Sequence, residues 1–96
     1  MRVIVSPQAS ADIDDILAFI AADNPDAAVK YVAGLRKKAK SLGQFPRIHP
    51  LREDLPREMR SAAYGSHVLI FRIRNSVVDV VRIVHGARDL PRLFER

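Results

Sequence analysis

Hydrophobic and polar positions recur along this chain with two periods, and each change of period marks a new element. Residues 2–5 (Arg-Val-Ile-Val) predict a short strand. Two apolar stripes follow at spacings of three and four residues, the pattern of one buried helical face. The first stripe is Ile13, Ile16, Leu17 and Ile20, and the second is Ala28, Val32, Leu35, Ala39 and Leu42.

Each predicted helix begins with a capping residue followed by proline, at Ser6-Pro7 and at Asn24-Pro25. Ser and Asn side chains accept from free N–H groups of the first turn, and proline fits there because its missing N–H needs no partner. The short connection predicts an antiparallel helical hairpin. We interpret three carboxylates early in the first helix as charges favoured by the helix dipole, and not as metal ligands: Asp12, Asp14 and Asp15.

The last third of the chain predicts a β-meander. A proline-rich stretch over 45–57 indicates an exposed loop, and residues 59–64 form a weak strand candidate. Residues 67–74 and 77–85 are stronger candidates because branched side chains favour pleated backbone. Asn75-Ser76 lies between them and predicts a two-residue hairpin turn.

An unbroken register from that turn sets Arg74 opposite Val77 and Arg72 opposite Asp79, and it assigns the side chains to two faces. We expect the more apolar face to pack on the helices: Leu69, Phe71, Ile73, Val78, Val80, Arg82 and Val84. We expect the other face to meet water or a partner: Val68, Ile70, Arg72, Arg74, Val77, Asp79, Val81, Ile83 and His85. Exposed apolar area beside charge is typical of a binding surface.

These elements predict a single α+β domain over residues 1–96, with an antiparallel helix hairpin packed on a small, mostly antiparallel β-sheet in the order β-α-α-β-β-β. The chain is 48% hydrophobic and 28% charged, as folded domains are. It has no cysteine, and its three histidines lack metal-ligand spacing, so we expect no metal and no cofactor. We find no signal peptide and no apolar run that spans a bilayer, so we expect a cytoplasmic protein without membrane contact.

The net charge of +5 favours an acidic partner. Residues 30–40 carry five cations and no acid, and beyond residue 40 every cation is arginine, whose planar donors suit carboxylate and phosphate. The candidate partner-binding residues are Arg72, Arg74 and His85 on the second sheet face, with Lys30 and Lys37 of the second helix next. A solvated helix surface is the alternative for the lysines.

The order of elements and five motifs together resemble the RelE/ParE superfamily of bacterial toxins from type II toxin–antitoxin systems, and its ParE members in particular. The resemblance covers nearly the whole chain. The motifs are residues 5–16 (Val-Ser-Pro-Gln-Ala-Ser-Ala-Asp-Ile-Asp-Asp-Ile), Asn24-Pro-Asp-Ala-Ala28, Phe45-Pro46-Arg47, Val68-Leu-Ile-Phe-Arg-Ile73 and His85-Gly-Ala-Arg-Asp89.

The resemblance implies a toxin that binds a cognate antitoxin, typically a ribbon-helix-helix protein of the ParD type, and that poisons DNA gyrase. Such a toxin acts by binding, so this interpretation assigns no catalytic residue and no small-molecule substrate. A binding module or an inactive relic with the same fold is a further alternative.

The alternative within the superfamily is a ribosome-dependent mRNA endoribonuclease of the RelE type. Its chemistry needs an acid, a base and cations around the phosphorane. The candidates for those roles are Arg72, Arg82, His85 and Arg88, with the histidine as acid or base. Residues 90–96 lack the Tyr, Lys or further His that nuclease members usually place there, which favours the ParE interpretation.

Overall fold

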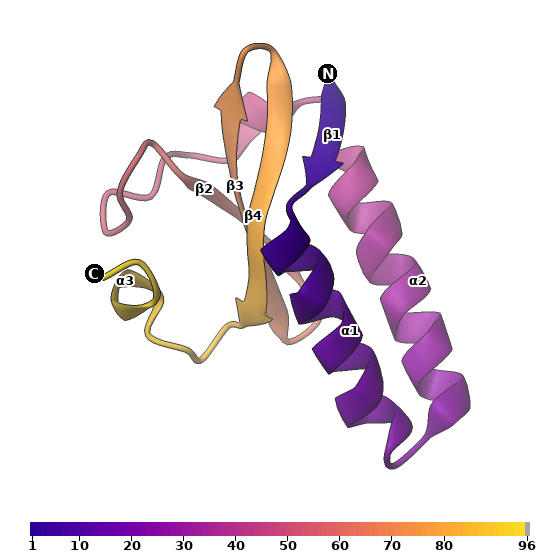
Figure 1. Ribbon diagram of the computed structural model, residues 1–96. Coiled ribbons are helices and arrows are strands. Elements are labelled where there is room, and N and C mark those ends of the chain that lie inside the picture. The colour runs from indigo at the N-terminus through magenta and orange to yellow at the C-terminus, as the bar shows by residue number, and fades with distance from the viewer. Residues whose placement is uncertain (96) are drawn as a thin grey trace.

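The computed structural model describes residues 1–95, in which two helices cover one face of a four-stranded sheet (Figure 1). The predicted order of elements is confirmed, and a 3-10 turn (η1) and a short last helix (α3) are added to it. The elements are β1 (Arg2–Val5), α1 (Pro7–Ala21), α2 (Pro25–Ser41), η1 (Pro46–Ile48), β2 (Arg60–Tyr64), β3 (His67–Arg74), β4 (Val77–His85) and α3 (Leu90–Leu93).

Both predicted helix caps are present. The Ser6 Oγ accepts from the Ala9 N–H at 3.0 Å, and the Asn24 Oδ1 accepts from the Ala27 N–H at 3.1 Å. The Ser6 hydroxyl also donates to the Val81 carbonyl at 2.9 Å, so the cap attaches α1 to the middle of β4. The apolar stripes of α1 and α2 pack against each other and against the sheet in one core. No helix within residues 1–95 has the length and apolar character needed to cross a bilayer.

The sheet has the strand order β1-β4-β3-β2, with β1 parallel to β4 and the other two pairs antiparallel. Asn75 and Ser76 both have positive φ, at 50° and 61°, as a two-residue turn of type I′ requires. The predicted pairs of Arg74 with Val77 and of Arg72 with Asp79 are confirmed.

A β-bulge changes the faces predicted for the second half of β4. Phe71 lies opposite Val80, whereas Ile70 lies opposite Arg82, so β4 has one extra residue at this point. One extra residue sends every later side chain to the other face of the sheet. The predicted sides of Ile83, Val84 and His85 were therefore wrong. Ile83 packs under the helices, Val84 packs on the opposite side, and His85 lines a groove beside α1. The side chain of Arg82, at the bulge, reaches α1 as predicted and bonds there to Asp12.

The sheet face opposite α1 and α2 is partly covered, which corrects the expectation that this face is open. Leu55 and Met59 of the long loop and Leu90 of α3 pack there on Ile70 and Val84 in a second, smaller core. This core accounts for the apolar residues that the sequence places on that face. Nearer the turn between β3 and β4, the same face carries Arg72, Asp79 and the exposed Arg74.

Candidate functional site

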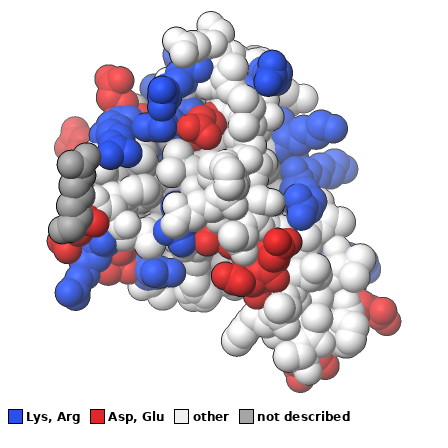
Figure 2. All heavy atoms as spheres, in the orientation of Figure 1, with Lys and Arg blue, Asp and Glu red and all other residues white. Residues whose placement is uncertain are grey.

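The five predicted partner-binding residues do not form one surface. Arg74 and His85 lie at opposite ends of the β3–β4 hairpin, because Arg74 pairs with Val77 at the turn and His85 pairs with His67 at the open end. Lys30 and Lys37 are exposed on α2, in the other layer. Figure 2 shows basic side chains gathered over the upper part of α2 and acidic ones over the start of α1.

Two of the four arginine and histidine residues considered for a nuclease are engaged with carboxylates. The Arg82 guanidinium donates to both Asp12 oxygens, from Nε at 2.8 Å and from Nη2 at 3.0 Å. This pairing raises the pKa of Arg82. The Arg72 Nε lies 3.4 Å from Asp79 Oδ2, across the hairpin. Only His85 and Arg88 of that set line a common groove.

The role of Asp12 goes beyond the helix-dipole interpretation. Its Oδ2 also accepts from the Ile83 N–H at 2.9 Å, next to the bulge. One carboxylate thus satisfies a backbone donor on the β4 edge and neutralises the neighbouring guanidinium. Asp14 and Asp15, in contrast, are exposed.

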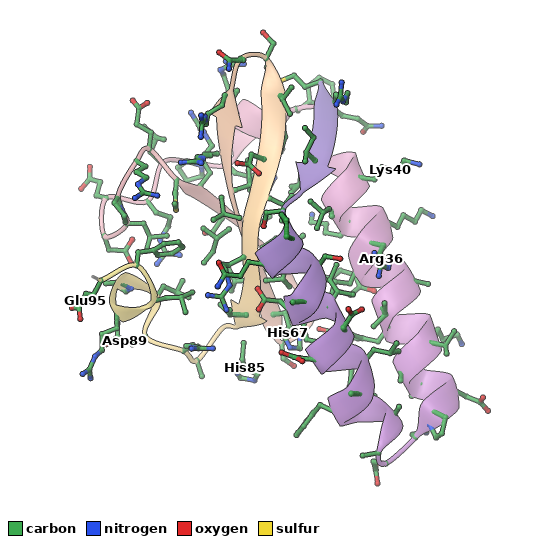
Figure 3. The ribbon with its side chains drawn as sticks, in the orientation of Figure 1. Arg36, Lys40, His67, His85, Asp89 and Glu95 are labelled. Atoms are coloured by element: carbon green, nitrogen blue, oxygen red, sulfur yellow. The ribbon has the colours of Figure 1, made fainter. Side chains whose placement is uncertain are left out.

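A groove of about 640 Å³ opens where the second half of α1 passes the open end of the β3–β4 hairpin. We call it the α1–β4 groove. Its apolar wall is formed by Ile16, Phe19 and Ile20, and the Phe19 side chain is 83% exposed. The remaining lining residues are Asp15, Tyr31, Ser66, His67, His85 and Arg88. Figure 3 shows His67 and His85 near each other beside α1.

A hydrogen-bonded network of aromatic residues forms the inner end of this groove. The Tyr31 hydroxyl lies 2.6 Å from His67 Nδ1 and 3.1 Å from the Tyr64 carbonyl. A hydroxyl has one hydrogen, so the tautomer of His67 sets whether Nδ1 donates to the Tyr31 oxygen or accepts from it. Burial and the nearby His85 lower the pKa of His67, and burial raises the pKa of Tyr31. Both groups are therefore uncharged at neutral pH.

His85 is held differently from His67. Its Nδ1 accepts from the Ala87 N–H at 3.1 Å, and its ring centroid lies 5.8 Å from that of His67 at an interplanar angle of 75°. With Nδ1 occupied as an acceptor, the neutral ring carries its hydrogen on Nε2, which is then a donor. The groove thus has a polar end made of one exposed imidazole donor and the Arg88 guanidinium.

Two glycines make room for the tyrosines. Gly65, at φ +54°, turns the chain from β2 to β3, and a Cβ there would lie 2.6 Å from the Tyr31 hydroxyl. A Cβ on Gly34 of α2 would overlap the Tyr64 hydroxyl. Sequence reasoning missed this network, since it joins residues from α2, β2 and β3. The signal that could have indicated the groove is Phe19, a large apolar residue that lies off the stripe of its helix.

Comparisons with known proteins agree with this architecture. Residues 3–90 match the family model described as the ParE toxin of the type II toxin–antitoxin system parDE. A solved chromosomal ParDE system from P. aeruginosa is similar at a TM-score of 0.75 and 22% identity, over 88% of this chain and 95% of that one. The toxin–antitoxin complex RelBE2 from Mycobacterium tuberculosis is similar at 0.60 and 24%, with the same coverage. At these identities, the structural likeness shows a shared fold. No curated protein sequence gave a match.

Proposed function

This chain belongs to the ParE toxin family of type II toxin–antitoxin systems, and from that premise we propose that it poisons DNA gyrase when free. In this proposal a cognate ribbon-helix-helix antitoxin of the ParD type neutralises it in the cytoplasm. The toxin needs no cofactor for this role, because it acts by holding its target and not by reacting with a small molecule.

The observation that carries the choice of binding over catalysis is the engagement of Arg82 by Asp12. A nuclease needs cations close to its acid and base, where negative charge develops on the phosphorane. Arg82 instead donates from both Nε and Nη2 to the Asp12 carboxylate, and Arg72 lies beside Asp79. The two arginines are thus used within the fold, which supports a protein that acts by contact.

A RelE-type ribonuclease is the second candidate, and one arrangement favours it. His67, His85 and Arg88 line the same groove, so two imidazoles and a guanidinium approach a common space. Imidazoles transfer protons near neutral pH, and a guanidinium binds phosphate. A ribonuclease therefore needs the His85 imidazole for proton transfer, whereas a toxin that acts only by binding gyrase does not.

Induced expression in a bacterial host tests the proposal. We expect growth arrest with cleaved-DNA complexes of gyrase and a DNA-damage response, and relief when the antitoxin is co-expressed. The variant His85→Ala/Arg88→Ala leaves the Asp12–Arg82 pair intact and removes the groove's candidate acid or base and its cation. Ribosome-dependent mRNA cuts without DNA damage, abolished in this variant, would establish the ribonuclease instead. Normal growth with a folded wild-type chain would reject both toxic activities.

A further inference from the structure

We propose that the outer face of the second half of α2 binds the phosphate backbone of duplex DNA. We call this surface the α2 basic face, and it consists of Arg36, Lys37 and Lys40. When the toxin acts, the duplex is the DNA segment that gyrase holds, and in naming that segment the inference rests on the proposed function. The contact between cations and phosphates does not depend on gyrase.

The α2 basic face follows from the helical repeat. Leu35 and Ala39 point into the core and are at most 2% exposed, whereas the three cations between and beside them are exposed. Arg36 and Lys40 are one turn apart, which is about 6 Å along the axis. They line a common hollow of about 190 Å³ beside β1, so a guanidinium and an ammonium approach the same space. Figure 3 labels both side chains on α2.

The charge of this face is not neutralised by the fold. The three ion pairs formed within residues 1–95 involve other arginines, and the remaining lining residues of the hollow are uncharged. The one acid of α2 is Asp26 in its first turn. Lys37 lies about 16 Å further along the axis, which exceeds the screening length of about 8 Å at physiological salt. The cations are therefore available to an external anion.

The helix dipole explains only part of this arrangement. Cations are stabilised by the dipole within the last turn of a helix. In α2 that turn contains Lys38 and Lys40. Arg36 and Lys37 precede it, so their charges serve no such purpose. A role outside the helix accounts for all three members of the face.

The composition of the face favours DNA over a protein partner. The exposed side chains of residues 36–41 are Arg36, Lys37, Lys40 and Ser41, and none of them is apolar. Protein–protein contacts have an apolar core and are depleted in lysine, whereas DNA-binding surfaces are polar and strongly positive. A second copy of the chain would bring like charges together. A phosphate backbone therefore fits this face best.

The salt dependence of DNA binding tests the contact directly. Fluorescence anisotropy of a short labelled DNA duplex gives the Kd of the purified toxin at several salt concentrations. Three phosphate contacts predict that log Kd rises with log salt at a slope of about 2.7, or about 80-fold between about 20 and 100 mM. Lys37→Gln/Lys40→Gln removes two contacts and should lower the slope to about 0.9, with a Kd at least tenfold higher at the lower salt.

Two matched controls separate position from total charge. Arg74→Gln/Arg92→Gln removes the same charge from exposed residues outside α2 and should change the Kd less than threefold. Lys37→Arg/Lys40→Arg keeps the charge and should keep the slope. Thermal melts of all three double variants should stay close to that of the wild type, since every substituted side chain is on the surface. In a cleavage assay with gyrase and plasmid, only Lys37→Gln/Lys40→Gln should need at least tenfold more toxin to trap cleaved DNA.

The outcomes distinguish this inference from the proposed function. Gyrase that is trapped equally well by the wild type and by Lys37→Gln/Lys40→Gln, with an unchanged salt slope, would end the inference and leave the toxin assignment in place. Equal losses for the two Gln double variants would reduce it to an effect of net charge. Weaker binding of the antitoxin and unchanged binding of DNA would assign the face to the antitoxin. A toxin that binds DNA through this face but never traps gyrase would reject the proposed function and leave the DNA contact standing.

Discussion

The Asp12–Arg82 pair leads to a specific prediction for stability, because the Asp12 carboxylate accepts three hydrogen bonds. Asp12 accepts from Nε and Nη2 of Arg82 and from the Ile83 N–H, at 2.8, 3.0 and 2.9 Å. The two charged side chains are only 12% and 15% exposed. Asp12→Ala therefore leaves a largely buried guanidinium without its counter-charge and a strand N–H without its acceptor.

The expected loss is large for a small domain. Breaking a buried ion pair by removing one partner costs about 3–5 kcal/mol, and an unpaired buried donor costs about 1–3 kcal/mol. The two costs overlap, and some water reaches the site, so we expect Asp12→Ala to lower the free energy of unfolding by about 3 kcal/mol. For a chain of this size that corresponds to roughly 12–24 °C in Tm.

Urea denaturation followed by circular dichroism measures this loss. Asp14→Ala is the control, because Asp14 is exposed on the same helix and should change the free energy of unfolding by less than about 0.5 kcal/mol. Adding Arg82→Met to Asp12→Ala should recover part of the loss, since it removes the unpaired charge. If Asp12→Ala were as stable as Asp14→Ala, the reasoning would be refuted, and Arg82 would again be available for phosphate.

Two further predictions concern the network below the groove. Because burial and His85 hold the pKa of His67 below the value of about 6.5 that it has when unfolded, the unfolded chain takes up a proton first as the pH falls. The free energy of unfolding should thus decrease as the pH drops below about 6.5, and less steeply in His67→Gln; equal slopes in thermal melts would contradict this. Gly34→Ala places a methyl group on the Tyr64 hydroxyl at a cost of about 1–3 kcal/mol, against about 1 kcal/mol gained in helix propensity. It should be destabilising in the wild type but neutral or stabilising beside Tyr64→Ala, which removes both the hydroxyl and the ring carbon Cζ that would lie 2.8 Å from the new methyl group. Equal effects in both backgrounds would exclude the overlap.

The helices were predictable because their determinants are local. A capping side chain bonds to a backbone group three residues away, as Ser6 does to Ala9 and Asn24 to Ala27. Every residue of the second apolar stripe is buried. The hairpin turn at Asn75-Ser76 is equally local, since a tight turn depends on the conformations of its own two residues.

The bulge and the coverage of the second sheet face were not predictable in this way. Nothing in the run of branched residues around Val81 marks an extra residue, because each of them suits either face of a strand. The side chain that bonds beside the bulge, Asp12, lies 70 residues from Arg82 in the chain. Likewise, the burial of Leu55 depends on its packing against β3, β4 and α3 and not on its neighbours in the proline-rich loop.

The pairing of arginines with carboxylates explains why charge alone did not locate the site. The net charge suggests that arginines are available for a partner. Arg52 of the loop lies beside Asp54, however, and Arg72 and Arg82 of the sheet lie beside Asp79 and Asp12. Each of these charges is balanced within the fold, so its substitution should act mainly on stability. Arg88 lines a groove and forms no such pair within residues 1–95, so its substitution should act on affinity and on the salt dependence of binding. For this member of the toxin family, the informative cations are those that the fold leaves unpaired, and the bond to Asp12 removes Arg82 from that group.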